Sequence, residues 1–134
     1  DRLIGILQSL VDAVLRYQTD GMWYQVTDQV GREGNYLETS GSSMFAYSIL
    51  KGTRLGYLDP SLRGKGLEAV KAIRDRYLTE EDGELHLGGI CSVAGLGGNP
   101  YRDGSYRYYL SEKVVADDFK GVGSYILACT EEER

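Results

Sequence analysis

The chain is organised around GICSVAGLGGNPYRDGSYRYY, residues 89–109. This segment holds five glycines, one proline and a dense run of Tyr, Arg and Asp, without a helical apolar period. Helical patterns stand on both sides of it. A long polar connection between ordered elements is usually functional or disordered, and the tyrosines and small apolar residues argue against disorder. We therefore interpret it as a loop that forms one wall of a binding site, with helices as its scaffold.

Four helices are expected around this loop. Apolar residues recur at helical spacing from Leu3 to Leu15, and a second helix is expected from Thr39 or Ser40 to about Gly56. A third begins at Asp59-Pro60 and continues to Leu78, and a fourth spans Gly121 to Glu132. Short extended segments are predicted at Met22–Val26, Leu85–Leu87 and Tyr106–Leu110.

This order of elements repeats. A helix, an Asp-Gly turn, an extended piece, a loop and a helix occur around Asp20-Gly21 and again around Asp82-Gly83, 62 residues later. Units of this kind are helical hairpins that stack side by side. The repeat predicts an all-α toroid or solenoid of alternating outer and inner helices, with short β segments in the connections. Two hairpins cannot close a ring, so we expect an open apolar inner face and, as a hypothesis, self-association.

Composition limits the possible partners. The 134 residues make one domain or part of one, and the net charge of −5, without a Lys/Arg cluster, argues against nucleic acid. No apolar run reaches the about 18 residues of a membrane span. Cys91 and Cys129 are too few for a disulfide framework and lack zinc spacing, so we expect reduced, buried thiols and no metal. No signal peptide is apparent, so we expect a cytoplasmic protein. The chain also looks like a fragment.

Several motifs, in order, resemble one enzyme family. They are Asp20–Val26, Gly34–Ser42, Lys51-Gly52 with Gly56–Leu58, Val93–Gly98, Tyr101–Tyr106 with Tyr108-Tyr109, and Asp118–Gly123. Together they resemble the unsaturated rhamnogalacturonyl hydrolases of glycoside hydrolase family 105, which are related to the unsaturated glucuronyl hydrolases of family 88. The resemblance covers nearly the whole chain. It implies an (α/α)6 barrel, of which residues 1–134 form a single unit, the C-terminal third.

The resemblance also implies a reaction. These hydrolases remove the unsaturated uronic sugar that a polysaccharide lyase leaves at the non-reducing end. An Asp protonates the C4=C5 bond, water adds at C5, and the resulting hemiketal rearranges to release the neighbouring sugar; this differs from the usual pair of carboxylates at the glycosidic bond. No metal or organic cofactor is implied. The family's catalytic Asp and active-site His lie before Asp1, and His86 stands in a different context, so we expect the chain alone to be inactive.

The loop supplies four candidate substrate contacts, and in the related glucuronyl hydrolases the corresponding loop helps to hold the sugar next to the unsaturated one. Arg102 presents a fork suited to a carboxylate, and Asp103 can bind hydroxyls, although the two could instead pair with each other or cap a turn. Tyr101 could stack on a sugar ring or pack in the loop. Ser105 could donate to a hydroxyl or serve in an Asp-Gly-Ser turn.

Other residues have simpler interpretations beside the functional one. Glu38 could hold a sugar hydroxyl, but we favour a charge stabilised by the first turn of a helix. Trp23 and Tyr24 could stack on sugars, and we favour a core role. His86 is expected to be exposed or hydrogen-bonded. The carboxylates between Glu80 and Glu84 could hold a cation but are more simply a solvated turn.

Three functions remain open from the sequence. The first is part of a saccharide hydrolase that contributes substrate-binding loops. The second is a non-catalytic helical-hairpin module that binds carbohydrate or protein. The third is another α/α toroid enzyme, such as a polysaccharide lyase or a cellulase-like hydrolase, which would share the architecture without the Tyr101–Ser105 pattern.

Overall fold

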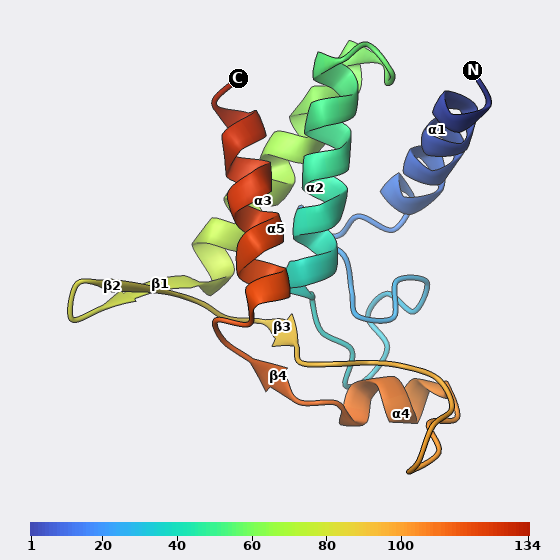
Figure 1. Ribbon diagram of the computed structural model, residues 1–134, viewed down its shortest axis with the longest axis vertical. Coiled ribbons are helices and arrows are strands. Elements are labelled where there is room, and N and C mark those ends of the chain that lie inside the picture. The colour runs from blue at the N-terminus through green and yellow to red at the C-terminus, as the bar shows by residue number, and fades with distance from the viewer.

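The computed structural model describes all residues from Asp1 to Arg134. Helices dominate it, and short strands lie in the connections, as the sequence predicted (Figure 1). The elements in chain order are α1 (Arg2–Leu15), α2 (Thr39–Arg54), the 3-10 turn η1 (Pro60–Leu62), α3 (Arg63–Tyr77), β1 (Leu78–Glu81), β2 (Glu84–Leu87), β3 (Ile90–Cys91), α4 (Tyr106–Ser111), β4 (Val114–Val115) and α5 (Phe119–Glu132).

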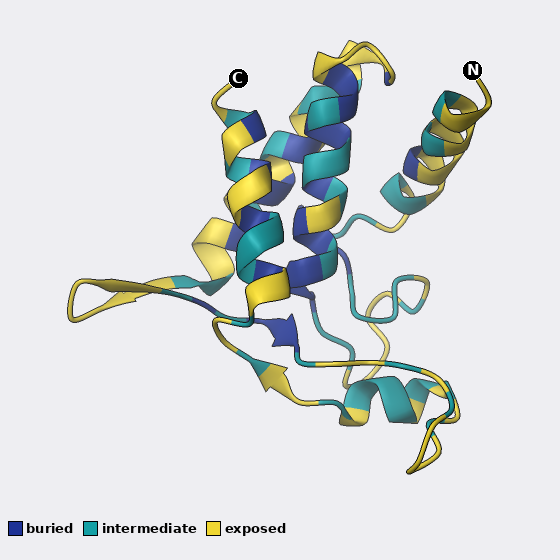
Figure 2. Ribbon diagram, viewed as in Figure 1, coloured by how far each residue is buried: buried dark blue, intermediate teal, exposed yellow.

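Helices α2, α3 and α5 form a bundle, and α1 stands to one side of it (Figure 1). Helices α2 and α5 run in the same direction and both begin beside β3, whereas α3 runs the opposite way. The buried positions gather where these three helices face one another (Figure 2). They include Ala46, Ile49, Leu50, Ala69, Val70, Ile73, Tyr125 and Ala128. Gly66 permits close packing of α3 on α2, because a Cβ there would lie 2.7 Å from Leu50 Cγ.

The two predicted Asp-Gly turns have nearly the same backbone conformation. Asp20 and Gly21 have φ of 48° and 79°, and Asp82 and Gly83 have φ of 52° and 83°. Each turn is closed by an antiparallel pair, Thr19 with Met22 in the first and Glu81 with Glu84 in the second. Two consecutive positive φ values are the signature of a type I′ hairpin turn, for which Asp-Gly is a preferred sequence. The repeated layout is therefore confirmed at both turns.

The structure differs from the sequence expectation in several places. The segment Met22–Val26 forms no strand and has only isolated antiparallel bridges at Met22 and Tyr24. The third helix begins at Arg63 and not at Pro60, because residues 60–62 form the 3-10 turn η1. Tyr106–Leu110 lies in helix α4 and not in a strand, because the Ser105 side chain caps this helix by accepting a hydrogen bond from Tyr108 N at 3.1 Å. The third helix ends at Tyr77, and Leu78 already belongs to β1. The last helix begins at Phe119, two residues earlier than expected, because Asp118 supplies its cap.

Three smaller expectations, which concern Trp23, His86 and the acidic β1–β2 turn, are confirmed. Trp23 is a core residue with 1% of its surface exposed, and its indole Nε1 donates to Val14 O at 2.7 Å. His86 is hydrogen-bonded through Nδ1 to Asp117 Oδ2 at 2.8 Å. The residues Glu80, Glu81, Asp82 and Glu84 lie exposed on the β1–β2 hairpin. None of the helices is both long and apolar enough to cross a bilayer.

Candidate functional site

A cavity of about 310 Å³ opens at the end of the bundle where α2 begins. This volume lies at the lower end of the range for small-molecule sites. Its wall is half apolar and half polar, and it combines aromatic rings, hydroxyl groups, an amide and one lysine. The lining residues are Trp23, Tyr24, Gln25, Thr27, Glu38, Ser40, Gly41, Ser42, Met44, Phe45, Cys91, Ala94 and Lys120.

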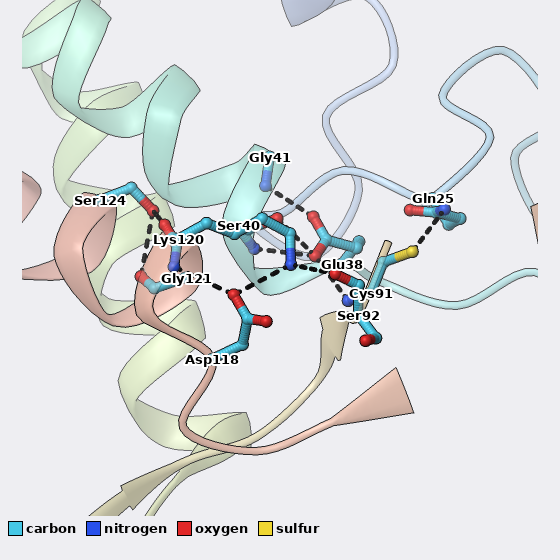
Figure 3. Close-up of polar contacts among 10 residues, drawn as sticks. All are labelled: Gln25, Glu38, Ser40, Gly41, Cys91, Ser92, Asp118, Lys120, Gly121 and Ser124. Carbon is cyan, nitrogen blue, oxygen red and sulfur yellow. Dashed lines mark hydrogen bonds and ion pairs between the residues drawn. The ribbon is translucent and has the colours of Figure 1, made fainter. Parts of the chain in front are cut away.

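Glu38 forms the floor of this cavity and caps α2. Its carboxylate accepts four hydrogen bonds: Ser40 N at 3.0 Å, Ser40 Oγ at 2.7 Å, Gly41 N at 2.6 Å and Cys91 N at 3.0 Å (Figure 3). The side chain is 5% exposed. A buried carboxylate at a helix start is stabilised by hydrogen bonds from the first backbone N–H groups and by the helix dipole. Glu38 therefore fixes β3 against the start of α2, in agreement with the structural role that we favoured.

Lys120 is the cation of the cavity wall. It lies in the first turn of α5, and its ammonium donates to Ser92 O at 3.0 Å and to Asp118 Oδ1 at 3.1 Å (Figure 3). Its side chain is 38% exposed. Hydrogen bonds from Lys120 N and its side chain lower the pKa of the Asp118 carboxyl, which remains an anion beside the ammonium.

Cys91 lies beside Glu38 and is buried as a free thiol, as predicted. Its Sγ accepts a hydrogen bond from Gln25 Nε2 at 3.2 Å, which joins the loop after α1 to β3 (Figure 3). Burial, reinforced by the nearby thiol, raises the pKa of Tyr36, which remains a neutral phenol near neutral pH. Cys129 is also free and is half-buried on α5.

Arg102 is enclosed by the glycine-rich loop. Its Nε donates to Gly97 O at 2.8 Å, and Gly97 N and Arg102 O pair at 2.8 Å. A Cβ at Gly95 would lie 2.5 Å from Arg102 Nη1, and one at Gly98 would lie 2.9 Å from Nη2. The glycines thus leave room for the guanidinium, and its two Nη groups have no hydrogen-bond acceptor within the chain. Arg102 and Asp103 form no ion pair.

The other loop candidates take part in local turns. Asp103 Oδ1 accepts from Ser105 N at 2.9 Å, which lowers the pKa of the Asp103 carboxyl. Ser105 Oγ caps α4. Tyr101 is 77% exposed and lies on the outside of the loop.

Of the five candidates, only Glu38 lines the cavity; the residues from Tyr101 to Ser105 lie in the adjoining loop, which reaches the cavity through Cys91 and Ala94. Lys120, Gln25 and Thr27 also line the cavity, and the sequence did not single them out as candidate site residues. An Asp followed two residues later by Lys at a helix start was a usable signal for Lys120, but the helix was placed after it. No group of three His, Cys, Asp or Glu side chains converges as metal ligands would.

The chain is similar in sequence to a known enzyme family and to two curated proteins. The sequence model described as Glycosyl Hydrolase Family 88 matches residues 1–134. Protein Atu3128 of Agrobacterium fabrum is 44% identical over 129 residues, which cover 91% of this chain and 55% of that protein. A 24.9 kDa protein in the picA locus of Rhizobium radiobacter gives the same figures. The chain thus spans about half the length of these curated relatives.

Two solved structures are similar over nearly the whole chain. A family 105 glycoside hydrolase from C. acetobutylicum has a TM-score of 0.95 and 49% identity over 98% of this chain, which corresponds to 38% of that protein. A possible family 105 member from Klebsiella pneumoniae has a TM-score of 0.80 and 26% identity over 98% of this chain and 31% of its own. The match of the family model along the full length means that this chain belongs to glycosyl hydrolase family 88 and resembles the hydrolases of family 105.

Proposed function

We propose that this chain is the C-terminal, substrate-binding part of an (α/α)6 hydrolase that removes an unsaturated uronic sugar from lyase-generated oligosaccharides. The reaction is hydration of the C4=C5 bond: an acid protonates the double bond, water adds at C5, and the hemiketal rearranges with loss of the neighbouring sugar. Residues 1–134 act as a single unit of the ring, the substrate is a pectin-derived rhamnogalacturonan fragment, and the reaction is cytoplasmic.

The proposal is supported mainly by the hydrogen bonds that the carboxylates at the site already accept. Glu38 is the only carboxylate that lines the cavity, and four donors occupy it. Asp118, next to the cavity, is bound to Lys120. A general acid must carry a proton that it can deliver to the substrate. Neither group suits that task, so the chain supplies binding surface and the catalytic Asp comes from outside these residues.

The loop from Tyr101 to Ser105 supports the substrate class. The two Nη groups of Arg102 are without acceptors, and a guanidinium can donate two hydrogen bonds to the oxygen atoms of an acidic saccharide. The exposed Tyr101 ring and the hydroxyl of Ser105 can contact the neighbouring sugar. We assign Tyr101, Arg102, Asp103 and Ser105 to the edge of the substrate site and Glu38 to its floor.

The test uses an unsaturated rhamnogalacturonan disaccharide and follows the ultraviolet absorbance of the C4=C5 bond. The chain alone should bind the disaccharide without turnover. A chimera in which this chain replaces the matched 38% of the C. acetobutylicum protein should consume it, with that parent as the positive control. Turnover by the chain alone would contradict the proposal and make Asp103 the first residue to replace. Binding without turnover in the chimera, with an active parent, would favour the non-catalytic binding module.

A further inference from the structure

We infer that Lys120 binds the acidic group of the saccharide, a sugar carboxylate, inside the cavity at the start of α2. This inference rests on the proposed function, because it assumes a saccharide ligand. Lys120 and Arg102 contact different groups of the ligand: Lys120 takes the sugar carboxylate inside the cavity, and the Nη donors of Arg102 are left for hydroxyl oxygens at its edge.

The Lys120 ammonium has more N–H donors than the chain uses. A lysine ammonium has three N–H donors. Two of them are engaged, with Ser92 O at 3.0 Å and Asp118 Oδ1 at 3.1 Å. The third has no acceptor in the chain, and Lys120 lines the cavity with 38% of its side chain exposed. The two engaged donors hold the ammonium in place, so the third is available to a ligand without a large ordering cost.

The charges around the cavity also favour an acidic ligand. Lys120 is the only cationic residue among the 13 that line it. The negative charge of Glu38 is directed at three backbone N–H groups and the Ser40 hydroxyl. Asp118 accepts from Lys120 N at 3.0 Å and caps α5. Asp118 also pairs with the Lys120 ammonium at 3.1 Å, so the third N–H of Lys120 is the cationic donor of the cavity wall that remains free.

The lining of the cavity also combines apolar side chains with polar groups. Tyr24, Met44 and Phe45 line the cavity, and Phe45 packs edge-on against Trp23 with ring centroids 5.1 Å apart. Ser40 Oγ donates to Glu38, which leaves its lone pairs free to accept from a sugar hydroxyl. A cavity lined by apolar side chains, hydroxyl groups and one cation suits a pyranose ring that carries a carboxylate.

Trp23 provides the measurement. It is the only tryptophan of the chain and it lines the cavity, so its fluorescence reports on occupancy. The probes are an unsaturated uronic disaccharide with a free carboxylate and the same disaccharide as its methyl ester. Lys120→Gln removes the charge, Lys120→Arg keeps it, and Lys113→Gln is the matched control, because Lys113 is exposed and does not line the cavity.

The expected result is that Lys120→Gln binds the free acid about tenfold more weakly than the unmodified chain, as for loss of one hydrogen bond to a charged group. Its affinity for the methyl ester should be unchanged, Lys120→Arg should restore most of the preference for the acid, and Lys113→Gln should behave as the unmodified chain. Equal affinity of the unmodified chain for acid and ester, an unchanged preference in Lys120→Gln, or no saturable change in fluorescence would each overturn the inference. Acid-selective binding through Lys120 together with an inactive chimera would support this inference while contradicting the proposed hydrolysis.

Discussion

Arg54 and Glu131 form a two-point ion pair between the last turns of α2 and α5. Arg54 Nε lies 2.6 Å from Glu131 Oε2, and Nη2 lies 2.9 Å from Oε1. Only 3% of the Glu131 side chain is exposed. The pair joins the last turns of α2 and α5, which lie at the end of the bundle away from β3 (Figure 1).

Arg54→Ala should lower the thermal unfolding midpoint by at least roughly 5 °C, because it leaves the buried Glu131 carboxylate with only the longer contact to Arg134 Nη1 at 3.6 Å. The hydrogen bond from Arg54 lowers the pKa of Glu131, so this stabilisation is present above about pH 4.3 and is lost as the pH falls through the lowered pKa. The control is Lys71→Ala, which breaks the exposed pair with Asp75 and should shift the midpoint by less than about 2 °C. Equal shifts for both variants would contradict the assigned role of Glu131.

The pair of His86 and Asp117 should make stability depend on pH in the opposite sense. The hydrogen bond that His86 donates to the Asp117 carboxylate raises the pKa of His86 and lowers the pKa of Asp117. The His86 contribution is therefore complete below about pH 6.5 and is lost as the pH rises through the raised pKa, while the Asp117 contribution is present above about pH 3.9. The difference in unfolding midpoint between the unmodified chain and Asp117→Asn should be largest near pH 5 to 6 and should shrink by pH 8. A difference that does not vary with pH would exclude the pair as its source.

Gly21 should tolerate a side chain less well than Gly31, although both have positive φ, 79° and 68°. A Cβ at Gly21 would lie 2.7 Å from Ala72 Cβ and 2.9 Å from Glu68 O, whereas a Cβ at Gly31 meets nothing within 4 Å. Gly31→Ala should cost about 1–2 kcal/mol of unfolding free energy from backbone strain alone. Gly21→Ala should cost more, because α3 must also move. Denaturant unfolding measures both, and an equal cost would show that the Asp-Gly turn does not pack closely on α3.

Gly95→Ala should weaken binding of the saccharide as much as removal of the Arg102 side chain does. The added Cβ would lie 2.5 Å from Arg102 Nη1 and would displace the guanidinium. We expect both Gly95→Ala and Arg102→Ala to weaken binding of the unsaturated disaccharide about tenfold, as measured by titration. Gly123→Ala is the control, because nothing lies within 4 Å of a Cβ there. Full affinity in Gly95→Ala would mean that the enclosed position of Arg102 is not needed.

The outward face of α1 should promote self-association. Leu3, Ile6 and Leu10 are 74%, 56% and 52% exposed on one helix. We expect sedimentation to detect concentration-dependent association, and we expect Ile6→Glu with Leu10→Glu to abolish it, since exposed apolar patches of this kind mark interfaces. A monomer at every concentration, with no binding of a hydrophobic dye, would contradict this expectation.

Local signals predicted the fold where local chemistry decides it. The Asp59 cap, the apolar period of α2 and the two Asp-Gly turns depend on neighbouring residues, and each was found in the expected place. The tyrosines of Tyr106–Leu110 suggested a strand by propensity, but the Ser105 cap outweighed it.

The site was harder to predict from the sequence than the fold, because the residues that line the cavity come from segments far apart in the chain. Gln25, Cys91 and Lys120 meet only after the helices pack. The role of Glu38 was predictable from its place before a helix, but its bond from Cys91 N spans 53 residues. Arg102 is enclosed because Gly95 and Gly98 approach its guanidinium closely. The sequence shows that these glycines are present, but it does not show how the backbone folds around Arg102.

The most direct measurement is the rate of C4=C5 hydration by the chimera with Arg102→Ala, compared with Arg107→Ala, an exposed cation of the same region. The account predicts a fall of about ten- to a hundredfold in kcat/KM for Arg102→Ala and little change for Arg107→Ala, because only Arg102 presents uncommitted donors from an enclosed position. Equal rates for the two variants and the unmodified chimera would contradict the claim that this chain contributes the binding site for the acidic saccharide.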